Sequence, residues 1–144
     1  MGVRRKAREC ALQMLFQWDL TRDDVDQIRS TFWEVHDDEP PEVIEFADTL
    51  IQGAVDHVEE IDPLIERHAE NWRLERMATV DRNVLRLAIQ EMRSDGKTPS
   101  TVVINEAIEI VRRFSNEGSP KFINGLLDSI RKEIEGERSP KSEV

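Results

Sequence analysis

The stretch VDRNVLRLAIQEMR, residues 80–93, decides the fold class, because its apolar residues recur at the three- and four-residue spacing of a helix. The same spacing begins upstream, and the sequence predicts a helix of about six turns over residues 71–93, bent near Thr79. Its apolar stripe comprises Leu74, Met77, Val80, Val84, Leu87, Ala88 and Met92. A helix with one such face must bury it against other helices, so this stretch predicts a helical bundle.

Apolar stripes of the same period recur along most of the remaining chain. No segment alternates apolar and polar residues with a period of two, so no strand is expected. The prediction is an all-α, compact bundle of about seven helices. The six further helices are expected at residues 4–20, 24–35 and from about 41 to 58, then at starts marked by Asp62-Pro63, by a Ser100 cap, and by a Ser119 cap followed by Pro120.

The composition describes one ordered, charge-rich domain. The chain has 144 residues, of which 38% are hydrophobic and 35% charged, and its well-spaced apolar residues argue against disorder. No apolar run approaches the roughly 18–20 residues that span a bilayer, and the N-terminus does not resemble a signal peptide. Cys10 is the only cysteine, so no internal disulfide can form. We therefore expect a cytoplasmic protein without a membrane partner.

Charge is distributed unevenly along the chain. The formal net charge is −10, and the segment from Asp19 to Asp48 alone has a balance of −9. The first eight residues carry no acid and four cations, Arg4, Arg5, Lys6 and Arg8. Charges farther apart than a Debye length of about 8–10 Å are mostly screened, so this basic N-terminal segment can act locally in an acidic protein.

The residue patterns that carry catalysis are missing from the sequence. The three histidines, His36, His57 and His68, lack HExxH spacing, and Cys10 belongs to no CxxC pair. The six glycines are dispersed, so no phosphate-binding glycine loop is expected. We therefore expect a protein that is not an enzyme and holds neither a cofactor nor a metal ion.

Four segments, in this order and spacing, resemble the NusB family of transcription antitermination factors. They are RRKARECALQMLFQWDL (4–20), VDRNVLRLAIQEM (80–92), INEAIEIVRRF (104–114) and SPKFINGLLDSI (119–130). The resemblance implies two helical subdomains that form a single NusB-like RNA-binding domain over residues 1–136. A polar, flexible tail is expected over residues 137–144.

The same resemblance implies a function in transcription. NusB proteins bind the boxA element of nascent, single-stranded RNA together with NusE, a small-subunit ribosomal protein. Within the elongation complex this pair helps RNA polymerase pass terminators, notably on ribosomal RNA operons. Some members of the family form homodimers.

Two groups of residues match the RNA-binding positions of the family. The basic residues Arg4, Arg5, Lys6 and Arg8 match its arginine-rich N-terminal segment and would contact phosphates, although a merely solubilising basic end is the alternative. The start of the last helix offers amide donors, a cation and an aromatic ring that could stack on an unpaired base. The residues implied there are Lys121, Phe122 and Asn124. Placement of Phe122 in the core is the alternative.

Four further residues match positions that face NusE in the family. Phe16 and Trp18 lie near the end of the first helix, and Glu75 and Asp81 would offer acids to a basic partner. The alternatives are a core position for Trp18 and an ordinary solvated face for the two acids.

A semi-buried ion pair between Arg86 and Glu106 is also expected, with a structural role only. Gly118 stands where the family often has an acid, so tighter RNA binding than in an acidic relative is expected.

Two other functions stay open at this point. In the first, the acidic segment 19–48 docks a basic protein and RNA binding is incidental. In the second, the chain is related to the NusB-like domain of ribosomal RNA cytosine methyltransferases but lacks their catalytic domain.

Overall fold

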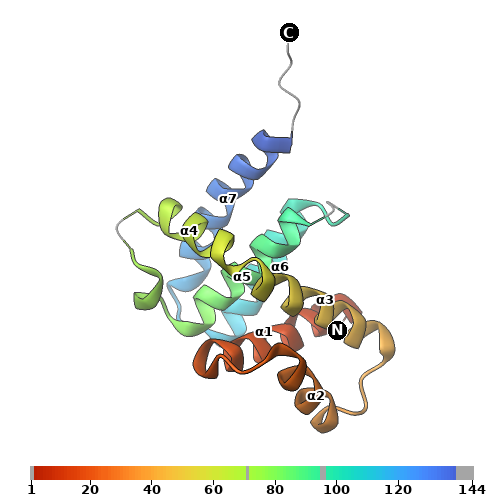
Figure 1. Ribbon diagram of the computed structural model, residues 1–144. Helices are drawn as coiled ribbons and strands as arrows, with labels where there is room; N and C mark the ends of the chain where they lie inside the picture. The colour runs from red at the N-terminus through yellow and green to blue at the C-terminus, as the bar shows by residue number, and fades with distance from the viewer. Residues whose placement is uncertain (1, 71, 95–96, 139–144) are drawn as a thin grey trace.

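Helices account for all the regular secondary structure in the described part of the chain. The computed structural model describes residues 2–70, 72–94 and 97–138, which hold seven α-helices, one turn of 3₁₀ helix and no strand (Figure 1). The elements are α1 (Val3–Thr21), α2 (Val25–Val35), α3 (Pro41–Asp56), α4 (Val58–His68), η1 (Leu74–Arg76), α5 (Thr79–Arg93), α6 (Ser100–Phe114) and α7 (Ser119–Arg138). The all-α prediction is therefore confirmed. None of the described helices is long and apolar enough to cross a bilayer.

The C-terminal boundary differs from the expected one. The last helix, α7, continues to Arg138, two residues beyond the expected end of the domain at residue 136. The rest of the predicted tail, residues 139–144, lies outside the described residues.

The single long helix expected over residues 71–93 is wrong in its first third. Met77 and Ala78 have extended backbones, with ψ of 152° and 140°, so the predicted bend is a complete break between η1 and α5. The break leaves both Leu74 and Met77 buried. The carboxylate of Glu66 accepts a hydrogen bond from the backbone N–H of Leu74 at 3.0 Å, which ties η1 to α4.

Two predicted helix starts are displaced. The start at Asp62-Pro63 is wrong, because α4 begins at Val58, directly after His57 ends α3, and contains Pro63. A proline inside a helix removes one backbone hydrogen bond, but the longer helix buries Ile61 and leaves no exposed linker after α3. The Ser100 cap is also wrong, since Pro99 occupies the cap position of α6.

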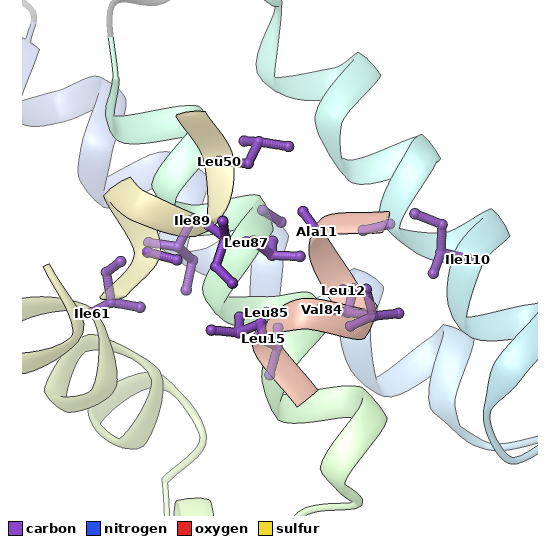
Figure 2. Packing of buried hydrophobic residues seen from close by; sticks show 14 of the residues in the cluster. Ala11, Leu12, Leu15, Leu50, Ile61, Val84, Leu85, Leu87, Ile89 and Ile110 are labelled. Atoms are coloured by element: carbon purple, nitrogen blue, oxygen red, sulfur yellow. The ribbon is translucent and has the colours of Figure 1, made fainter. Parts of the chain in front are cut away.

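The helices form two groups that share one core. The first group is α1, α2 and α3, while α6 and α7 pack on α5 and α4 contacts both α5 and α7. Because α1 and α3 also pack on α5, that helix is central to both groups. Figure 2 shows labelled side chains of α1, among them Leu12 and Leu15, in the same core as Val84 and Leu85 of α5.

Besides its apolar residues, α5 buries four polar side chains, Asp81, Asn83, Arg86 and Glu91. Arg86 is 2% exposed and donates two hydrogen bonds of 2.9 Å to the carboxylate of Asp62 on α4. It also lies 3.3 Å from the carboxylate of Asp19 at the end of α1. The expected pair between Arg86 and Glu106 is therefore wrong, because two carboxylates of other helices reach the guanidinium instead.

The pKa of Asp19 reflects this setting. Burial raises the pKa of the carboxyl, but the hydrogen bond from Arg82, the charge of Arg86 and the hydrogen bond from Asn83 outweigh it, and the pKa lies below its ordinary value. A lowered carboxyl pKa stabilises the fold above the unfolded-state pKa of about 3.9, and this contribution is lost as the pH falls through the folded-state value.

Replacement of Arg86 by Met should lower the free energy of unfolding by about 3 kcal/mol at pH 7, because Asp62 loses both hydrogen bonds from the guanidinium and Asp19 keeps Arg82 but loses its second buried cation. Urea denaturation should show that the stability difference between wild type and variant narrows as the pH drops to about 4 and below, where Asp19 becomes protonated and no longer needs the charge of Arg86. Arg112→Met is the control, at an exposed arginine that pairs with Glu109 of its own helix, and should change stability by less than about 0.5 kcal/mol. If the Arg86 variant loses less than about 1 kcal/mol of unfolding free energy, and this loss does not change with pH, the account is contradicted.

Candidate nucleic-acid interface

The basic N-terminal segment is largely neutralised within the chain. Arg5 donates two hydrogen bonds, of 2.7 and 2.8 Å, to the carboxylate of Glu106 on α6. Arg8, only 7% exposed, donates two more, of 2.8 and 2.6 Å, to Glu91 on α5. Such two-pronged pairs are strong and directional, so the segment holds α1 against α5 and α6. Arg8 is therefore a packing residue, and its predicted direct contact with RNA disagrees with its burial.

The two other cations of the segment lie at the surface. The Arg4 guanidinium stands 4.5 Å from the centre of the Phe46 ring and donates a hydrogen bond of 3.1 Å to Thr98. Lys6 Nζ lies 3.4 Å from a carboxylate oxygen of Glu39. Arg4 and Lys6 could therefore reach a phosphate, but Lys6 would have to leave its acidic partner.

The Arg5–Glu106 pair also shows in the pKa values. The hydrogen bond with Glu106 raises the pKa of Arg5. The same bond, from Arg5, lowers the pKa of Glu106. Both groups stay charged at neutral pH, so a phosphate that binds Arg5 must compete with this carboxylate.

The start of α7 is held by a cluster of three side chains, which we call the Asp81 clamp. Ser115 donates a hydrogen bond of 2.6 Å to one carboxylate oxygen of Asp81, and Ser119 donates one of 2.8 Å to the other. The two serine hydroxyls lie 3.0 Å apart. The clamp joins the loop before α7 to the first turn of α5.

The clamp changes the role that the sequence predicted for Ser119. It is the first residue of α7 and not its cap, since its hydroxyl is engaged by Asp81. Its backbone N–H bonds to the carbonyl of Asn116, and that of Phe122 bonds to the carbonyl of Gly118. The start of α7 therefore offers fewer free amides than its position as a helix end implies.

Beside the clamp lies a groove of about 380 Å³, which we call the Trp72–Phe122 groove. One wall comes from the η1 segment and the start of α5, the other from the start of α7. Its lining includes Trp72, Arg76, Met77, Gly118, Ser119 and Phe122. Phe122 is partly buried against the core with part of its ring accessible, so it is not a plain core residue. Lys121 and Asn124 are both exposed, and neither of them lines the groove.

The four residues matched to a protein partner do not form one surface. Trp18 is 7% exposed and lies in the core, with the Arg22 guanidinium 4.0 Å from its ring centre. Asp81 is buried in the clamp, so Trp18 and Asp81 are packing residues. Glu75 is exposed, 3.5 Å from Arg73. Phe16 is partly exposed.

Phe16 lines a second, mainly apolar depression, which we call the Phe16–Phe114 groove. Leu12, Val80 and Phe114 complete its apolar lining. Val80 directly precedes Asp81, and Phe114 directly precedes Ser115. The two grooves therefore lie on either side of the junction that the Asp81 clamp forms between α5 and the loop before α7.

Three residues of these grooves escaped the sequence prediction, namely Trp72, Arg76 and Phe114. Trp72 is 53% exposed and stands in the polar stretch WRLER, a signal that could have identified it. Phe114 is 45% exposed at the end of a helix whose stripe ends at Val111.

Nothing in the described residues gathers into a metal site of three or more His, Cys, Asp or Glu side chains. Cys10 is buried in the core, and burial, together with the charge of Glu39, raises the pKa of its thiol to about 11.

Comparison with known proteins gives one consistent match. The NusB family model matches residues 5–132. The transcription antitermination protein NusB of Koribacter versatilis (strain Ellin345) is 54% identical over 141 residues, which cover 98% of this chain and 97% of that protein.

Solved structures agree with the sequence match. The structure of T. maritima NusB is 40% identical and superposes with a TM-score of 0.83, over 90% of this chain and 91% of that one. A crystal structure of antitermination factors NusB and NusE in complex with double-stranded RNA has a chain 31% identical, also with a TM-score of 0.83, over 92% of this chain and 98% of that one.

Two substitutions should separate packing from RNA contact. Arg8→Gln should lower the free energy of unfolding by roughly 3 kcal/mol, because it leaves Glu91 buried without its cation, and should change RNA affinity less than about threefold. Lys121→Gln should leave stability within about 0.5 kcal/mol and reduce the salt slope of RNA binding by about 0.7. Urea denaturation and fluorescence anisotropy with a labelled RNA measure the two effects. If Arg8→Gln instead weakens RNA binding without a loss of stability, and Lys121→Gln leaves RNA binding unchanged, Arg8 is the RNA contact.

Proposed function

The chain belongs to the NusB family of transcription antitermination proteins, a non-enzymatic family, and on that premise we propose that it binds boxA RNA together with NusE, a small-subunit ribosomal protein. In this role it joins the elongation complex and helps RNA polymerase pass terminators, notably on ribosomal RNA operons.

The observation that carries the proposal is the composition of the Trp72–Phe122 groove. Phe122 lines the groove and is only partly buried, and the neighbouring Lys121, which is exposed just outside the lining, makes no ion pair with any described residue. A flat ring beside an uncompensated cation suits an unpaired base and its phosphate. In an acidic chain of net charge −10, such a combination offers a local site for an anion.

The N-terminal segment would supply a second contact to the RNA. Arg4 and Arg5 line the surface where α1 and α6 begin, whereas the groove lies beyond the end of α6. The fifteen residues of α6 measure about 22 Å at 1.5 Å per residue. An RNA that touches both surfaces must therefore extend along this helix, and Asn124 would meet it only outside the groove.

The Phe16–Phe114 groove is the surface that suits NusE. It is apolar, it contains the Phe16 side chain that the family resemblance implicates, and it adjoins the Trp72–Phe122 groove through the Asp81 clamp. Glu75 is an accessible acid but lies outside this groove, beside Trp72 and Arg73, while Trp18 and Asp81 contribute through packing. Adjacent sites allow RNA and NusE to bind together and to contact each other. If the chain forms a homodimer through the same apolar groove, NusE must displace the second copy.

Fluorescence anisotropy of a labelled boxA-type RNA, with and without NusE and across a salt series, tests the proposal. Binding should be at least about tenfold tighter with NusE and selective over a scrambled RNA, because positioning contacts to phosphate alone cannot discriminate sequence. Unselective binding that vanishes at moderate salt even with NusE would reject the RNA role. Retained NusE binding in that case would favour the acidic interaction module.

Gly118 gives a second test. A Cβ at this position meets no atom within 4 Å, so Gly118→Asp adds a negative charge to the groove edge without a clash. RNA affinity should fall by about 2- to 10-fold at low salt and recover part of that loss at high salt. Gly136→Asp adds the same charge near the far end of α7, also without a close contact, and should leave affinity unchanged. Equal or tighter binding by the Gly118 variant would contradict the expectation.

A further inference from the structure

Trp72 is a large aromatic side chain that the fold does not use. It is 53% exposed and takes no part in the apolar core. Aromatic rings contribute most when buried, so an exposed tryptophan in a groove offers apolar area that a ligand can cover. The ring lies in the same groove as Phe122, and no stacking between the two rings occurs in the described structure. Space between two aromatic walls is what a flat ligand requires.

The charges at this groove favour an anionic ligand. Arg76 lines it and is exposed, and neither Arg76 nor Lys121 makes an ion pair with a described residue. By contrast, Arg5, Lys6 and Arg8 each lie within 3.4 Å of a carboxylate oxygen. A phosphate at Arg76 or Lys121 therefore gains a charge interaction without displacing an internal acid.

One acid, Asp81, also lines the groove. Both of its carboxylate oxygens accept hydrogen bonds from serine hydroxyls, at 2.6 and 2.8 Å, so they are already engaged within the clamp, and the two cations Arg76 and Lys121 outnumber this one negative charge. The clamp also fixes the start of α7, and with it Phe122, relative to the start of α5. The Phe122 wall is therefore in place before a ligand arrives, which lowers the entropic cost of binding.

We propose that Trp72 and Phe122 form a two-sided pocket for one unpaired RNA base, with Arg76 and Lys121 binding the flanking phosphates. This inference rests on the proposed RNA-binding function and assigns Trp72 and Arg76, which the family resemblance did not implicate, to the interface. Stacking tolerates any base, so the pocket adds affinity and register along the RNA and leaves sequence discrimination to other contacts.

The experiment combines protein variants with single-site abasic RNAs. Binding of wild-type protein, Trp72→Leu and Trp72→Phe to boxA-type RNA is measured with NusE present, for RNAs that lack one base at each position in turn. Trp72→Leu should weaken binding to the intact RNA about 5- to 100-fold, and Trp72→Phe should restore most of the loss. At one RNA position, removal of the base should weaken wild-type binding by a similar factor and Trp72→Leu binding hardly at all, as expected for two groups in direct contact.

Arg76 is tested in parallel with a matched variant. Arg76→Gln should reduce the salt slope by about 0.7, whereas Arg112→Gln, an exposed arginine paired with Glu109, should not change it. Tryptophan emission gives an independent reading, because Trp18 is buried and Trp33 partly buried, so quenching by RNA should largely disappear in Trp72→Phe. Thermal melts confirm that the exposed substitutions leave the fold intact.

The outcomes separate this inference from the function on which it rests. The pocket is wrong and the function stands if wild-type protein binds boxA RNA selectively but Trp72→Leu binds it equally well. The same holds if the losses of binding free energy from base removal and from Trp72→Leu simply add at every RNA position. If the wild-type protein shows no selective binding with NusE, both fail. If Trp72→Leu instead loses NusE without RNA present, Trp72 belongs to a protein interface and the pocket is wrong.

Discussion

The buried guanidinium of Arg86 sets the arrangement of the helices. A charge taken out of water costs several kcal/mol unless carboxylates reach it, and here they come from two different helices, Asp62 of α4 and Asp19 of α1. Apolar surfaces can slide past one another with little change in free energy, whereas a two-pronged hydrogen bond has one geometry. The pair therefore fixes where α5 lies against α1 and α4. The first turn of α5, which holds Val80 and Asp81, is positioned with it.

That first turn separates the two candidate binding surfaces. Val80 lines the Phe16–Phe114 groove, while Asp81, one residue later, holds the loop and helix start that border the Trp72–Phe122 groove. Successive residues of a helix point about 100° apart, so one turn can serve two faces. The side chains proposed to meet RNA and those proposed to meet NusE thus depend on the same short backbone segment. This arrangement accounts for the closeness of the two candidate sites.

The helices could be predicted from the sequence, but the contacts between polar side chains could not. Apolar residues that recur with a period of 3.6 indicate a helix with one buried face. For this reason α1, α2 and α6 agree with their predicted ranges to within about one residue. The break before α5 could not be predicted, because Leu74 and Met77 also fit the apolar stripe of one continuous helix. Ion pairs such as Arg8–Glu91 depend on how helices cross, and 30 acids offer too many partners to choose among. Ser119 shows the same limit of sequence-based prediction, since its hydroxyl donates a hydrogen bond to a carboxylate 38 residues away in the sequence.

The basic N-terminal segment and the Trp72–Phe122 groove lie near opposite ends of α6, so the two proposed RNA contacts would make the protein a bivalent ligand for RNA. Once one surface holds the RNA, the other meets it at an effective concentration set by the intervening nucleotides, which can reach millimolar values when the chain length matches the span. Each contact can then be weak on its own, and exchange of a phosphate for Glu106 at Arg5 need not be favourable in isolation. Affinity in such a system depends on RNA length as strongly as on any single side chain. An RNA too short to bridge the helix loses the whole of the second contribution, however well its sequence fits the first.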